Sequence, residues 1–211
     1  ELMQTMTQTI NTPTEQRVWG MAMIIAPLLF LISTFYWQNG EYTITGGTLL
    51  VVATVFWIPA LTGLFARLKS TMPSYASWGW LLALCGVISG NNFGMRGIYA
   101  QVFGISKETL LHEAAIHSVS FNITMFISGP LFPLSLLVLG IQLMRKKAVP
   151  YWVGFLLCAG AVAFPVSRIA RIEWIAHVAD FLLFIPIAYL GWQSLTRNQG
   201  ASQVILDSGS Y

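Results

Sequence analysis

Charged residues are scarce in this sequence. Asp, Glu, Lys and Arg make up 9% of its 211 residues, whereas hydrophobic residues make up 55%. Soluble domains carry about 25% charged residues, so a chain with this little polar surface is expected in a membrane. The net charge of +3 does not indicate a nucleic acid partner, because the basic residues are scattered or lie at the ends of apolar runs.

Cysteine is nearly absent as well. Cys85 and Cys158 each lie within an apolar run, and the sequence contains no Cys-x-x-Cys motif. Thioredoxin-like redox chemistry is therefore not expected, and the two thiols are interpreted as small buried hydrophobic side chains. The apolar runs also lack the strict alternation of polar and apolar residues that a transmembrane β-barrel requires.

Long apolar runs dominate what is present. A bilayer core about 30 Å thick requires roughly 20 apolar residues per helix. Six runs have that length, at residues 18–37, 46–66, 77–100, 117–144, 150–170 and 173–194. They predict an all-α integral membrane protein whose six-transmembrane-helix bundle covers residues 18–194. A polar N-terminal segment at 1–17 and a polar C-terminal tail at 195–211 flank it.

Basic residues set the expected orientation. One group falls on a single side of the membrane when both termini are cytoplasmic: Arg17, Arg67, Lys69, Arg145, Lys146, Lys147 and Arg197. The positive-inside rule prefers that arrangement, and the basic residues of the other side are accompanied by acids. The sequence therefore predicts a multi-pass protein of the plasma or inner cell membrane with cytoplasmic termini.

The connection before residue 117 predicts a short helix at the membrane surface. In "ISKETLLHEAAIH", Ser106 is a candidate N-cap and Glu108 lies in the first turn. Leu110 and Leu111 supply an apolar side that suits an interfacial helix running into the next span.

A short motif recurs along the chain. "EAAIHSVSF" begins at Glu113 and "EWIAHVADF" begins at Glu173, and both have Glu-x-x-x-His followed by Phe at the same offset. Glu41-x-x-x-Thr45-x-x-Thr48 has related spacing. The pattern predicts three helical hairpins with a weak internal repeat, and polar groups at matching depth.

These polar groups predict one outward-facing pocket. Spacings of three and four residues place Glu173, His177 and Asp180 on one helix face. The inner halves of the six runs carry no charge, which indicates a single outward-opening site and no continuous ion path. The predicted pocket residues are Asn92, Arg96, Glu113, His117, Arg168, Arg171, Glu173, His177 and Asp180.

An aspartate within hydrocarbon costs about 3 kcal/mol on insertion scales. Asp180 is therefore expected to face a polar cavity, to be protonated, or to pair with Arg96, Arg168 or Arg171. A structural salt bridge is an alternative to a ligand-binding role, and the arginines could instead extend to lipid headgroups.

The first functional hypothesis is a pocket for a small ligand or a metal ion. His117, His177 and Asp180 could bind a divalent transition metal, and a metal-bound hydroxide would make the protein a membrane lipid hydrolase. Histidines and an aspartate within the membrane resemble those of the seven-helix ceramidase and adiponectin-receptor group, although the helix count and the motif spacings differ.

Three alternatives stay open. His117 and His177 could be axial ligands of a haem whose propionates contact arginines, which would indicate electron transfer. Ser128 in "FISGPLF" and His177 resemble the rhomboid membrane proteases, but Phe126 occupies the position of that family's first motif glycine. The protein could also be a non-catalytic subunit, or an assembly or transport-accessory protein, that forms an oligomer or contacts another membrane protein. The sequence does not decide whether it is an enzyme.

Overall fold

The described part of the chain folds into helices and a short β-hairpin. A computed structural model describes residues 12–208, and the side chains of residues 12–196. The helices are α1 (Pro13–Thr34), α2 (Ile44–Ala66), α3 (Pro73–Val102), α4 (Lys107–Ile116), α5 (Ser118–Phe121), α6 (Leu131–Arg145), α7 (Tyr151–Ala170) and α8 (Glu173–Ser208). A π-helix, η1 (Asn122–Ile127), follows α5. Strands β1 (Trp37–Gln38) and β2 (Glu41–Tyr42) pair antiparallel between α1 and α2.

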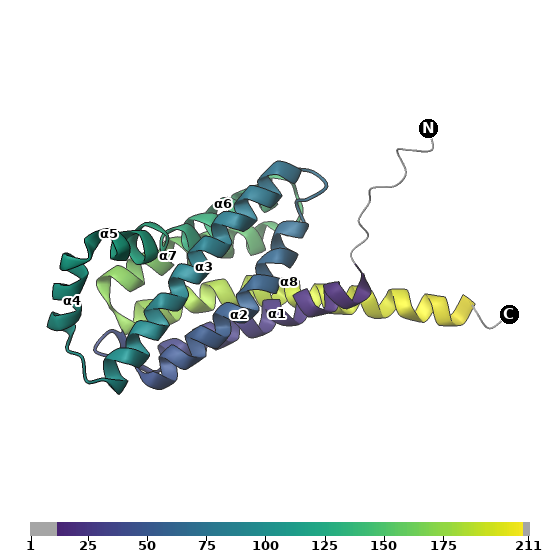
Figure 1. The fold of residues 1–211 in the computed structure, drawn as a ribbon. Helices are drawn as coiled ribbons and strands as arrows, with labels where there is room; N and C mark the ends of the chain where they lie inside the picture. Colours follow the sequence, from purple (N-terminus) through teal and green to yellow (C-terminus); the bar gives the residue numbers. More distant parts are fainter. Residues whose placement is uncertain (1–11, 209–211) are drawn as a thin grey trace.

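Six long helices form a closed ring (Figure 1). Going round it, α1 packs against α2, α2 against α3, α3 against α6, α6 against α7, α7 against α8, and α8 against α1. The β1–β2 hairpin and α4 lie at one end of this ring, which we call the hairpin end. The start of α1 and the C-terminal part of α8 lie at the opposite end, which we call the termini end.

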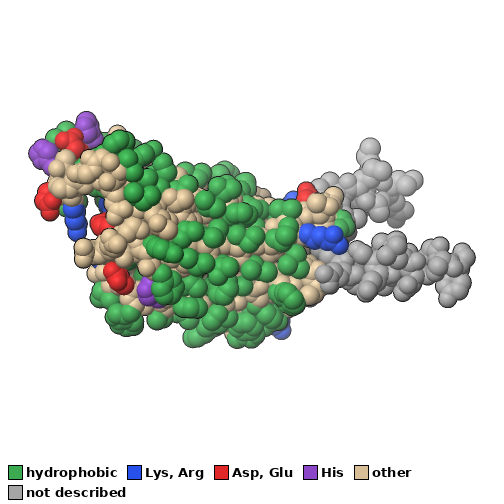
Figure 2. Space-filling view, turned by 90° about the horizontal axis from the view of Figure 1, so that it is seen from below, with side chains coloured by type: hydrophobic (Ala, Val, Ile, Leu, Met, Phe, Trp, Pro, Cys, Tyr) green, Lys and Arg blue, Asp and Glu red, His purple; other side chains and the backbone are tan. Residues whose placement is uncertain are grey.

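Five helices among the described residues are long and apolar enough to cross a membrane. They are Pro13–Thr34, Ile44–Ala66, Ser118–Arg145, Tyr151–Ala170 and Glu173–Thr196. Helix α3 has 30 residues but is less apolar, because it contains several glycines, two asparagines and Arg96. Figure 2 shows hydrophobic side chains covering the middle of one face, with charged side chains at both ends and histidines at one end. This distribution suits a multi-pass membrane protein.

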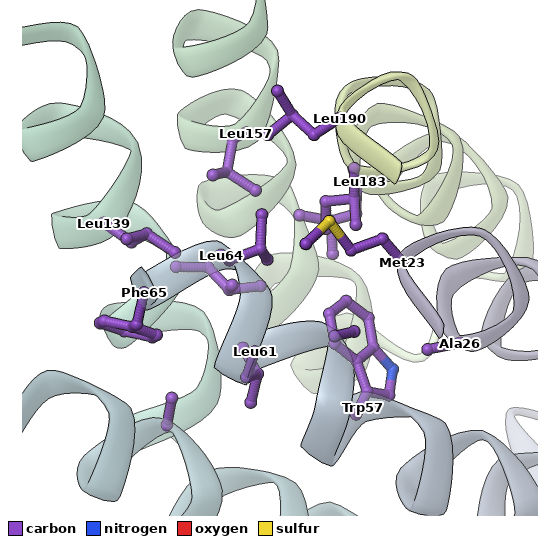
Figure 3. Close-up of a cluster of buried hydrophobic side chains, with 14 of the residues drawn as sticks. Met23, Ala26, Trp57, Leu61, Leu64, Phe65, Leu139, Leu157, Leu183 and Leu190 are labelled. Atoms are coloured by element: carbon purple, nitrogen blue, oxygen red, sulfur yellow. The ribbon is translucent and has the colours of Figure 1, made fainter. Parts of the chain in front are cut away.

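The core of the ring is built from large apolar side chains. Trp57, Leu61 and Leu64 of α2 are fully buried and meet Leu157 of α7 and Leu183 of α8 in one cluster (Figure 3). Side chains from α1 and α6 complete this cluster. Because lipid chains are as apolar as the core, dense packing and close helix approach must hold such a bundle together.

Glycines bring α2 and α3 into close contact. A Cβ atom added to Gly47 would lie 2.6 Å from the carbonyl oxygen of Gly94, so no larger side chain fits at that crossing without movement of the helices. Small residues at helix crossings commonly have this role in membranes.

Local sequence signals define the helix starts. Thr12 and Glu15 form a capping box at α1, with Pro13 at the first helical position. The Ser106 hydroxyl accepts a hydrogen bond from the Thr109 amide at 3.2 Å, which confirms the N-cap expected for α4. Helix α4 ends at Ile116, and His117 leaves the helical conformation.

The predicted span at 117–144 corresponds to the candidate membrane span Ser118–Arg145, but this span is not one uninterrupted α-helix. Helix α5 is followed by η1 and then by a turn, where Leu131 donates to the carbonyl of Ser128. Pro130 lacks an amide hydrogen and cannot extend a helix ladder from α5, so α6 begins anew at Leu131.

The C-terminal segment predicted as a polar tail is helical over most of its length. Helix α8 continues to Ser208, through most of the segment 195–211 that the sequence indicates as a polar tail, and projects beyond the ring (Figure 1). Residues 1–11 of the predicted N-terminal segment and residues 209–211 of the tail lie outside the described residues.

The internal repeat is not confirmed. Its three glutamates occupy three different settings: Glu41 lies in strand β2, Glu113 in α4, and Glu173 at the first position of α8. The shared spacing therefore does not correspond to three equivalent helix starts.

Candidate functional site

A cavity of about 420 Å³ lies within the ring and extends to the hairpin end. Its walls come from α1, α2, α3, η1, α6, α7 and the β-hairpin. Eight lining side chains are aromatic: Phe30, Trp37, Tyr42, Trp57, Phe93, Phe126, Phe132 and Phe164. The charged lining residues are Arg96, Arg168 and Arg171, and no acidic residue is among them. The cavity is therefore an apolar chamber with three guanidinium groups near one end.

Arg168 is held by a buried ion pair. Its Nη2 donates to Oδ1 and Oδ2 of Asp180 at 2.9 and 3.1 Å, and the Asp180 side chain has no exposed surface. The guanidinium also lies over the rings of Phe164 and Trp37, at 4.4 and 4.9 Å from their centroids. Of the settings expected for Asp180, the structure shows the pairing with an arginine.

A second carboxylate is shared by the other two arginines. Glu41 Oε1 accepts from Arg171 Nη1 at 2.9 Å, and Glu41 Oε2 accepts from Arg96 Nη2. Arg171 also donates to the carbonyl of Gly40 at 2.6 Å. Glu41 thus connects the hairpin to the end of α3 and to the residue that terminates α7.

The hairpin that carries Glu41 has a tight two-residue turn. Asn39 and Gly40 have φ angles of 53° and 73°, as a type I′ turn requires, and Asn-Gly is a preferred sequence for that turn. A Cβ atom on Gly40 would lie 2.8 Å from Cβ of Arg171. Glycine is therefore required at this position both by the backbone conformation and by the neighbouring arginine.

The hairpin also places two aromatic side chains against the cavity. Trp37 and Tyr42 are cross-strand partners, with ring centroids 5.2 Å apart in an edge-to-face arrangement. Burial raises the pKa of the Tyr42 phenol, while the nearby positive charge of Arg168 opposes this effect. The phenol is therefore neutral at physiological pH and adds no negative charge to the site.

The charges of this cluster do not balance. Three guanidiniums, of Arg96, Arg168 and Arg171, face two carboxylates, of Glu41 and Asp180. The cluster therefore has one formal positive charge in excess. Neither Glu41 nor Asp180 lines the cavity, whereas all three arginines do, so the charged surface that faces the cavity is basic.

The histidines of the predicted pocket lie away from the cavity. The side chain of His117 is 65% exposed and lies 3.9 Å from Glu113, one turn back in the chain. His177 stacks on Phe35 with a centroid distance of 4.1 Å, and its Nδ1 lies 3.1 Å from the Thr34 hydroxyl. Neither histidine lines the cavity.

Two other predicted pocket residues have different positions. The Asn92 amide donates to the carbonyl of Thr124 at 3.1 Å, so it holds η1 against α3. Glu173 is exposed at the start of α8. The structure thus brings together Arg96, Arg168, Arg171 and Asp180 from the predicted set.

The predicted metal ligands are not gathered into a site. Among the described residues, no group of three or more His, Cys, Asp or Glu side chains could hold a metal ion. Both oxygens of Asp180 accept hydrogen bonds from Arg168, and His117 lies on a surface helix end. The described geometry therefore lends no support to His117, His177 and Asp180 as a metal site, or to the two histidines as a haem-ligating pair facing this cavity.

The rhomboid-like residues do not form a catalytic pair either. The Ser128 hydroxyl donates to the carbonyl of Ile123 at 2.9 Å. His177 contacts Thr34 at the end of α1 and Phe35 just after it. No hydrogen bond joins Ser128 to His177 in the described part of the chain.

The π-helix was not anticipated from the sequence. The Ser89 hydroxyl donates to the carbonyl of Thr124 at 2.9 Å, and Asn92 donates to the same oxygen. These contacts from α3 satisfy a backbone carbonyl of the wider η1 turn and position Met125 and Phe126 at the cavity. Short π segments often occur at functional sites.

Comparison with known proteins adds no relative. No protein-family model, curated protein or solved structure matches this chain.

Proposed function

We propose that this chain is a six-span protein of the plasma or inner cell membrane and that its cavity binds an amphiphilic anion. The ligand has an apolar body and one acidic head, such as a carboxylate or a phosphate. The lining of the cavity supports this proposal: eight aromatic side chains accompany three arginines, and no acidic side chain of the described residues lines the cavity.

Helix α3 is the proposed sixth span. Its 30 residues would extend about 45 Å at 1.5 Å per residue, which exceeds the thickness of the bilayer core. It also occupies the place in the ring between α2 and α6. An even number of spans puts both termini on one side, and the positive-inside rule makes that side the cytoplasm.

The arginines suit an acidic head. Guanidinium groups bind carboxylates and phosphates through paired, charge-assisted hydrogen bonds, and the excess positive charge of the cluster matches one negative charge. Arg96 and Arg171 are partly exposed, at 21% and 37% of their side-chain surfaces. They can therefore contact a ligand without completely breaking their ion pairs with Glu41.

The apolar walls suit the rest of the ligand. Ligand pockets commonly measure about 300–1,000 Å³ and are mostly apolar with a few polar groups, and the cavity of about 420 Å³ falls in this range. A fully water-soluble anion would leave the aromatic walls unused, whereas a hydrocarbon would leave the guanidiniums without a partner.

The proposal is tested by comparing cis-parinaric acid, a long-chain fluorescent carboxylic acid, with its methyl ester in nanodiscs. Hydrogen bonds to charged groups contribute about 1.5–3 kcal/mol, so the acid is expected to bind roughly tenfold or more tightly than the ester. Arg96→Gln and Arg171→Gln should reduce this preference. Arg145→Gln, at the termini end, is the charge-matched control and should leave it unchanged.

Two results would contradict the proposal. One is the absence of saturable binding of the acid to the parent protein. The other is an equal loss of preference in Arg145→Gln, which would attribute the effect to net charge rather than to the cavity.

A further inference from the structure

The cavity reaches the molecular surface on one side of the ring. Four of its lining residues are exposed: Phe126 in η1, Pro130 before α6, Ile169 in α7, and Arg171. Phe126 and Ile169 are 54% and 82% exposed. The lining residues contributed by α1, α2 and α3 are buried or partly buried, so the opening lies between η1 and α7.

The packing of the helices explains this opening. Ser89 and Asn92 attach η1 to α3, whereas α7 packs against α6 and α8. The turn at Ser128–Pro130 separates η1 from α6, so η1 does not follow α6 along the face of α7. A portal between η1 and α7 results, with Phe126, Pro130 and Ile169 on its rim.

With α7 placed across a bilayer, the portal would open to the hydrocarbon and end at the membrane boundary. Its rim residues Phe126, Pro130 and Ile169 are apolar, and α7, about 30 Å long at 1.5 Å per residue, spans roughly the thickness of the bilayer core. Arg168 and Arg171 lie at the hairpin end of that helix. A lipid in the adjacent leaflet has the same order of parts, with its acidic head at the boundary and its chain in the hydrocarbon.

We propose that the ligand enters the cavity sideways from the bilayer, between η1 and α7, and that it is a membrane-dissolved amphiphilic acid. This inference rests on the proposed function, because it names the source and class of the ligand of the same cavity. The head moves along the boundary to the arginines while the chain slides past Phe126 and Ile169. A water-borne anion would instead pass the hairpin.

The test measures association and dissociation rates of cis-parinaric acid with the protein in nanodiscs. In a background with Cys85→Ala and Cys158→Ala, single cysteines are introduced by Ile169→Cys at the portal, Val166→Cys elsewhere on α7, or Gln38→Cys on the hairpin. Each variant is measured before and after reaction with N-cyclohexylmaleimide. Residue 166 is exposed and does not line the cavity, so it is the matched control.

Modification at 169 is expected to slow both association and dissociation by at least about fivefold. Slower dissociation would identify a blocked route, because the loss of a lining contact would instead speed dissociation. Modification at 166 or at 38 should change neither rate. The sideways route would be overturned by unchanged rates after modification at 169, or by equal slowing after modification at 166. Slowing only after modification at 38 would also overturn it, because it would show access from water. If the unmodified background protein shows no saturable binding, the proposed function itself fails, and this result is distinct from a failure of the route alone.

Discussion

Removing either partner of the buried Arg168–Asp180 pair is expected to destabilise the protein unequally. Taking one charge from a buried pair costs about 3–5 kcal/mol, because the other charge is left uncompensated. Arg168→Met leaves the Asp180 carboxylate in a site with no exposed surface. It also removes cation–π contacts over Phe164 and Trp37, each contributing about 0.5–1 kcal/mol or more. We therefore expect a loss at the upper end of that range.

Asp180→Leu should destabilise the protein less than Arg168→Met. The Arg168 guanidinium would keep its aromatic neighbours and its hydrogen bond to Ser167, and its side chain is 17% exposed toward the cavity. A loss of about 2–3 kcal/mol is expected. The double variant Arg168→Met/Asp180→Leu leaves no unpaired charge and should recover most of the stability lost by Arg168→Met alone, since apolar replacement of a whole pair is often close to neutral.

The free energies of unfolding can be measured by titrating mixed micelles with sodium dodecyl sulfate and following circular dichroism. The three variants and the parent form a double-mutant cycle. With single losses of about 5 and about 2–3 kcal/mol and a loss of about 2 kcal/mol in the double variant, the expected coupling energy is about 5 kcal/mol in magnitude. The reasoning is wrong if Asp180→Leu is the more damaging single change, or if the losses of the two single variants simply add in the double variant.

Three further predictions concern the hairpin, the helix crossing and the charge balance. Gly40→Ala should destabilise the folded protein by about 1–2 kcal/mol, because the φ angle of Gly40 is 73° and the new Cβ would meet Arg171. Thermal unfolding measures this loss, and Asn39→Gly, which should destabilise the protein less, is the control. Gly47→Val should lower the yield of folded protein in detergent, because a side chain would displace Gly94; a normal gel-filtration profile and melting temperature would contradict the tight crossing. Glu41→Gln should tighten binding of cis-parinaric acid by about 1 kcal/mol, roughly fivefold, and weaker binding would show that Glu41 orients the arginines rather than competing with the ligand.

Much of the fold follows from hydropathy. Apolar runs of about 20 residues predict membrane helices because backbone groups must be satisfied internally in lipid, and every predicted run contains a long helix in the structure. The surface helix α4 was predicted from Ser106 and Glu108, because an N-cap acts within a single turn. Signals of this kind are local, so they can be read without knowledge of the neighbouring helices.

The β-hairpin and the π-helix do not follow from hydropathy. Asn39-Gly40 is a strong turn signal, but the apolar run at 18–37 predicts a helix throughout and so masks the strand that precedes the turn. Segment η1 has no comparable signal. Its wider turn depends on donors from Ser89 and Asn92, about 35 residues earlier in the chain, and a single helix does not reveal such partners.

The histidines illustrate a second kind of failure. His117 and His177 share a spacing with their glutamates, which suggested equal depth and a common site. In the structure, the neighbours of His177 are Thr34 and Phe35 from the opposite end of the sequence, whereas His117 ends a surface helix. Spacing determines which residues share a helix face, but packing between helices determines what that face meets.

The π-helix makes the side wall of the cavity sensitive to chain length. Each residue of an α-helix rotates the chain by about 100° about the helix axis. The deletion of one residue within Asn122–Ile127 would convert this segment into ordinary α-helix and rotate the preceding chain by that angle relative to the following chain. Phe126 would then leave the rim. Substitutions along η1 change single side chains, whereas an insertion or deletion there would change which side chains face the opening, so the number of residues in this segment is itself part of the architecture of the cavity.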